Sequence, residues 1–140
     1  LFKEYEELNP KTKYRIVRYG NVLYSTGSVL CKWKDRLEKG EEITVTDLKS
    51  TRFYWTVEQA VDLMFECLDN ALDSKPYCPE MKAMKLENIL DAMIEKYAKE
   101  RPTIRTIGLQ PGENMHETID GKVFSNQVEQ FTKDEISKMI

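Results

Sequence analysis

Apolar residues recur along the chain in two spacings, and these predict alternating strands and helices. Residues 14–19 and 43–46 are short runs rich in β-branched and aromatic side chains, which is typical of strands. Residues 28–39 and 86–97 instead repeat apolar side chains every three or four positions, as on one face of a helix. Strands alternating with helices in this way predict an α/β fold with parallel strand pairing.

The clearest helix is predicted behind Thr56, where Thr56 and Gln59 have the spacing of a capping box. A period of 3.6 then continues through four turns, carried by Val57, Ala60, Val61, Met64, Phe65, Leu68 and Leu72. Lys75-Pro76 is expected to end this helix. Thr132 and Glu135 repeat the capping-box spacing close to the end of the chain.

Three short stretches complete the predicted elements. Residues 2–8 have the character of a helix end, which Asn9-Pro10 terminates. Tyr77-Cys78 and residues 103–108 are expected to be strands, and Gly20-Asn21 is expected to end the strand before it. Because the chain begins with Leu1 inside a helical pattern, we expect a fragment or a processed product of a longer protein.

Composition narrows the function classes. The 140 residues are 41% apolar, which suits one modest core, and the 21 basic and 24 acidic residues are intermixed. A net charge of -3 without a basic stripe gives no reason to expect nucleic acid or a membrane surface as partner. No apolar run approaches the roughly 20 residues that span a bilayer.

Cysteine and histidine usage argues against a metal site. The three cysteines share no CxxC spacing, and the chain has a single histidine, His116. Reduced, buried thiols and a charged N-terminal segment unlike a signal peptide predict a cytoplasmic location. No serine, cysteine or carboxylate pair is placed to work with His116, so a structural role is favoured over acid–base chemistry.

Three polar clusters follow apolar runs, where α/β proteins place ligand contacts. Asn21 offers a side-chain amide at the end of a strand, although Gly-Asn is also ordinary turn chemistry. Arg52 precedes a capped helix and suits a phosphate or carboxylate, unless it is an exposed neighbour of core aromatics. Glu113 follows a strand, as carboxylates that bind ribose do, but a solvent-facing turn explains it equally. No phosphate-binding loop, GxGxxG sequence or nucleophile elbow is present.

Taken in order, these segments resemble the C-terminal half of extended short-chain dehydrogenases/reductases, and in particular the UDP-N-acetylglucosamine 4,6-dehydratases of polysaccharide biosynthesis. The resemblance covers about residues 1 to 135. It is carried by RYGNV at 18–22, GSV at 27–29, ITVTD at 43–47, TRF at 51–53, TVEQAVD at 56–62, MKL at 84–86, IG at 107–108, PGE at 111–113 and HE at 116–117.

The resemblance implies a Rossmann-like α/β fold from which the N-terminal dinucleotide-binding half is absent. Residues 1–140 would then form one substrate-binding segment. Residues 1–26 would contain the end of the Rossmann-like part, with its last sheet strand and a ligand loop. Residues 27–140 would belong mainly to the substrate-binding subdomain.

The resemblance also implies a UDP-sugar site with no catalytic residue and no metal ligand. Asn21 would contact the diphosphate or the sugar, Arg52 the phosphates, and Glu113 the ribose hydroxyls. Tyr19 would approach the nicotinamide of NADP or NAD. The wall of the uracil pocket would be made by Val29, Thr44, Val45 and Thr46.

Gln110 departs from the family pattern, which usually has an arginine before Pro-Gly-Glu to clamp the diphosphate. A neutral amide cannot replace a bidentate guanidinium. A charge-assisted hydrogen bond contributes about 1.5–3 kcal/mol, so diphosphate affinity should fall by roughly an order of magnitude or more.

The family's Gly-rich loop, Tyr-x-x-x-Lys pair and catalytic Asp-Lys lie upstream of this chain. Hydride transfer needs that tyrosine and the nicotinamide, so this portion of an NAD(P)-dependent lyase is expected to be inactive alone. The alternative is a non-catalytic UDP-sugar-binding or protein-interaction module derived from the same fold. A sheet edge left by the missing half would favour a homo-oligomer, or docking of that half.

Overall fold

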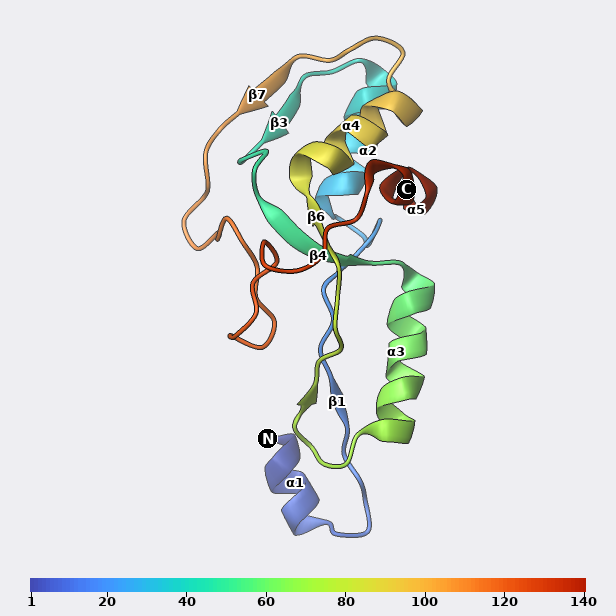
Figure 1. The fold of residues 1–140 in the computed structure, drawn as a ribbon, viewed down its shortest axis with the longest axis vertical. Helices are drawn as coiled ribbons and strands as arrows, with labels where there is room; N and C mark the ends of the chain where they lie inside the picture. The colour runs from blue at the N-terminus through green and yellow to red at the C-terminus, as the bar shows by residue number, and fades with distance from the viewer.

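The computed structural model describes residues 1–140 as an elongated molecule with two parts (Figure 1). Five helices are present: α1 (Phe2–Leu8), α2 (Val29–Lys39), α3 (Val57–Asn70), α4 (Leu86–Tyr97) and α5 (Lys133–Met139). The strands are β1 (Ile16–Val17), β2 (Asn21–Val22), β3 (Ile43–Val45), β4 (Thr51–Trp55), β5 (Pro76–Tyr77), β6 (Ala83–Lys85) and β7 (Ile104–Thr106). We call α2, β3, α4, β7 and α5 the main body, and α1, β1, α3 and β5 the extension.

The strands form three small sheets in which parallel pairing predominates. Parallel pairs join β1 to β5, β2 to β4, and β3 to β7, while β4 and β6 are antiparallel. The three-stranded sheet has the order β2-β4-β6 and lies between the main body and the extension. The α/β class and the parallel pairing expected from the sequence are thus confirmed.

One hydrophobic core fills the main body and extends onto the three-stranded sheet. Helices α2 and α4 contact each other, and α5 covers α4. Trp33 of α2 also donates its indole N–H to the carbonyl oxygen of Thr44 at 3.2 Å, which fixes the helix to β3. The cluster consists of Leu23, Leu30, Trp33, Leu37, Ile43, Val45, Tyr54, Met84, Leu86, Ile89, Leu90, Ala92, Met93, Ile136 and Ile140.

Helix α3 begins where the sequence predicted, but its apolar stripe faces outward. The capping box of Thr56 and Gln59 is present in both directions. Its buried side chains are Ala60, Leu63 and Cys67, which face β1 and β4. The exposed apolar stripe is 42–96% accessible and comprises Val57, Val61, Met64, Phe65 and Leu68 of α3, with Leu72 just beyond the end of the helix. Periodicity identified the helix, but six of the seven side chains that carried it are uncovered in this chain.

Several element boundaries differ from the sequence prediction. The first strand is limited to β1, and Gly20-Asn21 does not end the pairing, because Asn21 and Val22 form β2 against β4. Helix α3 ends at Asn70, before Lys75-Pro76. Strands β4 and β6 were not expected, since neither shows a clear alternation of apolar and polar residues. The three cysteines are free, and no helix combines the length and apolar character needed to cross a membrane.

Candidate functional site

A cavity of about 530 Å³ lies where β2, β3 and β4 converge with the loop that precedes α2. Seven of the nine residues proposed from the sequence line this cavity, although they come from segments far apart in the chain. They are Asn21, Val29, Thr44, Val45, Thr46, Arg52 and Glu113. The structure therefore brings the three polar clusters together at one site.

Gly20 allows β2 to approach β4 closely enough to place Asn21 at the cavity. A Cβ on Gly20 would lie 2.5 Å from both the Cβ and the carbonyl oxygen of Phe53. Only glycine fits this contact without moving a strand. Beside it, Asn21 pairs with Tyr54 in the parallel ladder, and its side-chain Nδ2 donates to the Phe53 carbonyl oxygen at 3.1 Å.

Arg52 is held firmly and still has hydrogen-bonding capacity. Its Nη1 donates to the carbonyl oxygens of Thr51 and Met115, each at 2.9 Å, and its Nη2 donates to Glu113 Oε1 at 3.2 Å. The side chain is only 16% exposed. A guanidinium has five N–H donors, so two are without a partner in the chain. An orientation fixed in advance with donors to spare suits the binding of an anion.

Glu113 connects three segments at the edge of the cavity. Its Oε1 also accepts from the Thr46 hydroxyl at 3.0 Å, and its Oε2 accepts from the backbone N–H of Gln110 at 3.3 Å. The turn that carries it needs Gly112, whose φ is +84°. The Glu113 carboxylate thus ties β3, β4 and the segment after β7 together, and Oε2 keeps room to accept from a ligand hydroxyl.

Tyr54 lines the same cavity and was missed by the sequence analysis. It is 6% exposed and its hydroxyl makes no hydrogen bond within the chain. Burial raises the pKa of Tyr54 to about 12, while the nearby Arg52 opposes that rise. The phenol therefore stays protonated near neutral pH and can donate to a ligand. The inward position of Tyr54 follows from its place on β4, a strand that the sequence pattern did not predict.

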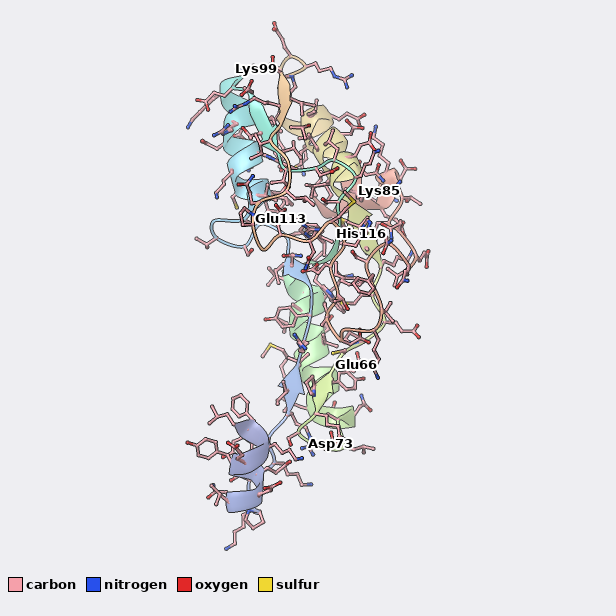
Figure 2. The ribbon with its side chains drawn as sticks, turned by 90° about the vertical axis from the view of Figure 1, so that its left-hand side faces the viewer. Glu66, Asp73, Lys85, Lys99, Glu113 and His116 are labelled. Carbon is pink, nitrogen blue, oxygen red and sulfur yellow. The ribbon has the colours of Figure 1, made fainter.

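His116 lies outside the cavity, in a hydrogen-bonded network behind β4. Its Nδ1 is 2.8 Å from Thr51 Oγ1, which is 2.7 Å from the buried Ser125 Oγ. Ser125 Oγ in turn donates to the Thr51 carbonyl oxygen at 2.9 Å. All three contacts are hydrogen bonds if His116 donates from a protonated Nδ1 to the Thr51 hydroxyl and that hydroxyl donates to Ser125 Oγ. His116 thereby holds the segment after Glu113 against β4. Figure 2 shows Glu113 and His116 at mid-height of the molecule.

Gln110 and Tyr19 are the two proposed site residues that do not line the cavity. The Gln110 side chain donates from Nε2 to the Gly108 carbonyl oxygen at 3.1 Å and is exposed. Tyr19 is 40% exposed and has no hydrogen-bonding partner for its hydroxyl within the chain. The structure therefore gives neither residue a direct position in the site.

The parallel strand pairs and the cavity beside them agree with part of a Rossmann-like extended short-chain dehydrogenase/reductase fold. The chain belongs to the polysaccharide biosynthesis protein family, whose sequence profile matches residues 1–138. The family assignment from the sequence is confirmed.

Individual relatives agree with this assignment. The UDP-N-acetylglucosamine 4,6-dehydratase (inverting) of Campylobacter jejuni is 29% identical over 112 residues, which cover 79% of this chain and 32% of that enzyme. The crystal structure of Pen from Bacillus thuringiensis is 36% identical with a TM-score of 0.74, and covers 83% of this chain and 37% of that one.

A third comparison shows the fold alone. The UDP-glucose 4-epimerase of Thermus thermophilus, solved in complex with NAD, has a TM-score of 0.68 at 16% identity, and covers 97% of this chain and 48% of that one. The chain therefore spans between about a third and a half of the length of these three proteins.

Proposed function

We propose that this chain is the nucleotide-sugar-binding portion of a UDP-N-acetylglucosamine 4,6-dehydratase that supplies precursors for polysaccharides. The observation that carries the proposal is the convergence of Asn21, Arg52 and Glu113 on one cavity. A volume of about 530 Å³ lies in the range of small-molecule sites. The name of the Campylobacter relative supports UDP-N-acetylglucosamine as the ligand.

Each lining group has a role in this proposal. The two free N–H donors of Arg52 bind the diphosphate, and Glu113 Oε2 accepts from a ribose hydroxyl. Val29 and the residues of β3 form the wall against the uracil. Gln110 leaves the diphosphate without a second cation, so the chain binds it more weakly than a relative with arginine there.

The cofactor of the whole enzyme, NAD or NADP, does not fit the residues of this chain. The chain contains no glycine-rich phosphate-binding sequence. Tyr19, the residue proposed to approach the nicotinamide, points its hydroxyl at no protein group and lies outside the cavity. The redox chemistry is therefore assigned to the part of the fold that the relatives have beyond this match, and the chain alone is proposed to be inactive.

The apolar stripe of α3 supports a partner in the same proposal. Five apolar side chains of α3 and Leu72 just beyond its end are uncovered, and contiguous apolar surface marks a contact. The chain covers only 32% of the Campylobacter dehydratase. We assign the stripe to the remainder of that fold, with self-association of the chain when the remainder is absent. A cytoplasmic location remains part of the proposal.

A non-catalytic binding or interaction module is the second candidate, and the same stripe favours it. The two candidates differ in their requirement for the rest of the fold. Dehydration of UDP-N-acetylglucosamine after the dinucleotide-binding half of a relative is supplied would support the enzyme. Sugar-nucleotide binding with no reaction under those conditions would favour the module.

Titration calorimetry tests the ligand. UDP-N-acetylglucosamine should bind the chain, and Arg52→Ala should weaken binding by at least about tenfold through loss of charge-assisted bonds. Arg52→Lys keeps the charge and serves as the variant that preserves the fold, yet it loses the planar fork and should also bind more weakly. Arg105→Ala removes an exposed arginine paired with Glu42 outside the cavity and is the matched control. No binding by the unaltered chain would overturn the proposal.

A further inference from the structure

The side-chain amide of Asn21 is fixed in one polarity. Its Nδ2 donates to the Phe53 carbonyl oxygen and to Glu117 Oε2, both at 3.1 Å. An amide nitrogen has two hydrogens, so both are used within the chain. Rotating the amide by 180° would bring Oδ1 against a carbonyl oxygen and a carboxylate, which are both acceptors. Oδ1 is therefore the polar atom that Asn21 has left for a ligand.

Glu117 is the group that fixes this polarity, and it is itself anchored on two sides. Its Oε2 accepts from the backbone N–H of Phe53 at 3.0 Å, next to the bond from Asn21. Its own backbone N–H donates to Ser125 Oγ at 2.8 Å. Ser125 is fully buried and is also bonded to Thr51. A carboxylate held by β4 and by the buried network cannot easily turn away from Asn21.

The electrostatics of this corner of the cavity favour the same conclusion. Arg52 supplies positive charge with free donors, whereas Asn21 offers an acceptor with the Glu117 carboxylate directly behind it. The diphosphate group of a sugar nucleotide has only acceptor oxygens at neutral pH and carries negative charge. Oδ1 would give a phosphate no hydrogen bond, and Glu117 would repel it. The diphosphate therefore belongs beside Arg52.

We propose that Asn21 accepts a hydrogen bond from a hydroxyl or amide N–H of the bound sugar, and that Glu117 is the positioning residue that holds Asn21 in this acceptor role. The inference rests on the proposed function, and it chooses between the two ligand groups, diphosphate and sugar, that the sequence left open for Asn21. Asn21 then recognises the sugar, and Arg52 binds the phosphates.

Glu117→Gln tests the proposal because it weakens the acceptor that fixes the polarity of Asn21. An oxygen at the Oε2 position can still accept from the Phe53 N–H and from Asn21 Nδ2, but it is neutral. The new NH₂ group replaces Oε1, which lies 3.4 Å from the same Nδ2, so a second acceptor is lost. Calorimetric titration of the full chain with UDP-N-acetylglucosamine and with UDP separates the consequences. Affinity for UDP-N-acetylglucosamine should fall about tenfold, the size of one hydrogen bond. Affinity for UDP should stay within about twofold.

A double-mutant cycle separates positioning from a general structural role. Asn21→Ala should produce the same selective loss for the sugar nucleotide, and adding Glu117→Gln to it should cause no further loss. Glu129→Gln is the matched control, because Glu129 is an exposed carboxylate paired with Lys82 outside the cavity. That control should change neither affinity.

The outcomes distinguish failure of this inference from failure of the proposed function. If the unaltered chain binds both ligands but Glu117→Gln weakens both equally, or adds fully to Asn21→Ala, the positioning role is wrong and the function stands. If the unaltered chain binds neither ligand, both are overturned. Should Glu117→Gln not fold, NMR of the Asn21 side-chain amide in the unaltered chain still decides. Its protons should stay protected when UDP-N-acetylglucosamine binds, and a large shift with UDP alone would contradict the proposal.

Discussion

Helices α3 and α4 have equally regular apolar periods in sequence, but the apolar face of α4 is buried and most of that of α3 is exposed. Helix α4 buries its stripe between α2 and α5, with Ile89, Leu90 and Met93 almost inaccessible. Helix α3 turns only Ala60, Leu63 and Cys67 toward β1 and β4 and leaves most of its apolar side chains exposed. An apolar stripe therefore indicates a surface that should be buried, but it does not show that the same chain buries it.

Truncating equivalent leucines on the two helices should give the largest difference. Leu90→Ala empties a filled site and should lower the free energy of unfolding by about 2–5 kcal/mol. Leu68→Ala removes an exposed side chain and should change it by less than about 0.5 kcal/mol. Urea unfolding at low protein concentration measures both. Equal losses would mean that the α3 stripe is covered after all.

Charging the α3 stripe should alter association rather than stability. Burying a Phe or Leu side chain contributes about 1.5–3 kcal/mol, so Phe65→Lys should weaken self-association by about tenfold or more. Light scattering after gel filtration over a range of concentrations measures this. Glu58→Lys, at an exposed polar position on the same helix, is the control and should leave association unchanged. A chain that is monomeric at all concentrations would contradict the expected self-association.

Gly20→Ala should affect the sheet that joins the two regions. The added methyl group meets Phe53 and should destabilise the chain by about 1–3 kcal/mol through overpacking. It should also displace Asn21 and weaken binding of UDP-N-acetylglucosamine. Gly40→Ala is the matched comparison, because Gly40 lies outside the cavity, has no atom within 4 Å of the added Cβ and has only a φ of +72° to oppose the change. Comparable loss of ligand binding in both variants would argue that the Gly20 contact is unimportant.

The smallest expected effect is the acid sensitivity of α5, which covers α4. Hydrogen bonds from the Thr132 backbone and hydroxyl, with help from Lys82, lower the pKa of Glu135 to about 2. The group is more acidic when folded, so its contribution is complete above the ordinary pKa of about 4.5 and disappears as pH falls toward 2.

Hydrogen exchange of the α5 amides between pH 5 and pH 2 measures this contribution. Glu135→Gln keeps an acceptor for the cap, so its α5 should show less additional opening on acidification than the unaltered chain. An α5 whose protection depends on pH equally in both proteins would exclude Glu135 as the cause.

Local signals explain which parts of the fold were predictable. The first residues of α2, α3 and α5 follow from N-capping side chains next to them in sequence, such as Thr56 with Gln59. Strands β2 and β4 were missed because their existence depends on each other across 30 or so residues rather than on a local pattern. The same cause hid Tyr54, whose position is known only once β4 is known.

The site followed the same division. The residues proposed to bind a nucleotide sugar were selected from their order along the chain, and seven of the nine line one cavity. The sequence did not show that Gln110 and Tyr19 lie outside the cavity. The Gln110 side chain turns back to the Gly108 carbonyl oxygen, and the Tyr19 side chain is exposed. Glu117 could be noticed only as part of the family pattern, not as a partner of Asn21.

The sequence by itself determined the helices, the α/β class, the family and the candidate ligand contacts, because caps, periodicity and ordered motifs are written in neighbouring residues. Only the tertiary structure decided that α3 leaves its stripe open and that Asn21 offers an acceptor. The partners of Asn21 lie 32 and 96 positions away. Hydrogen-bond polarity and the covering of a face depend on which distant groups the fold brings within contact.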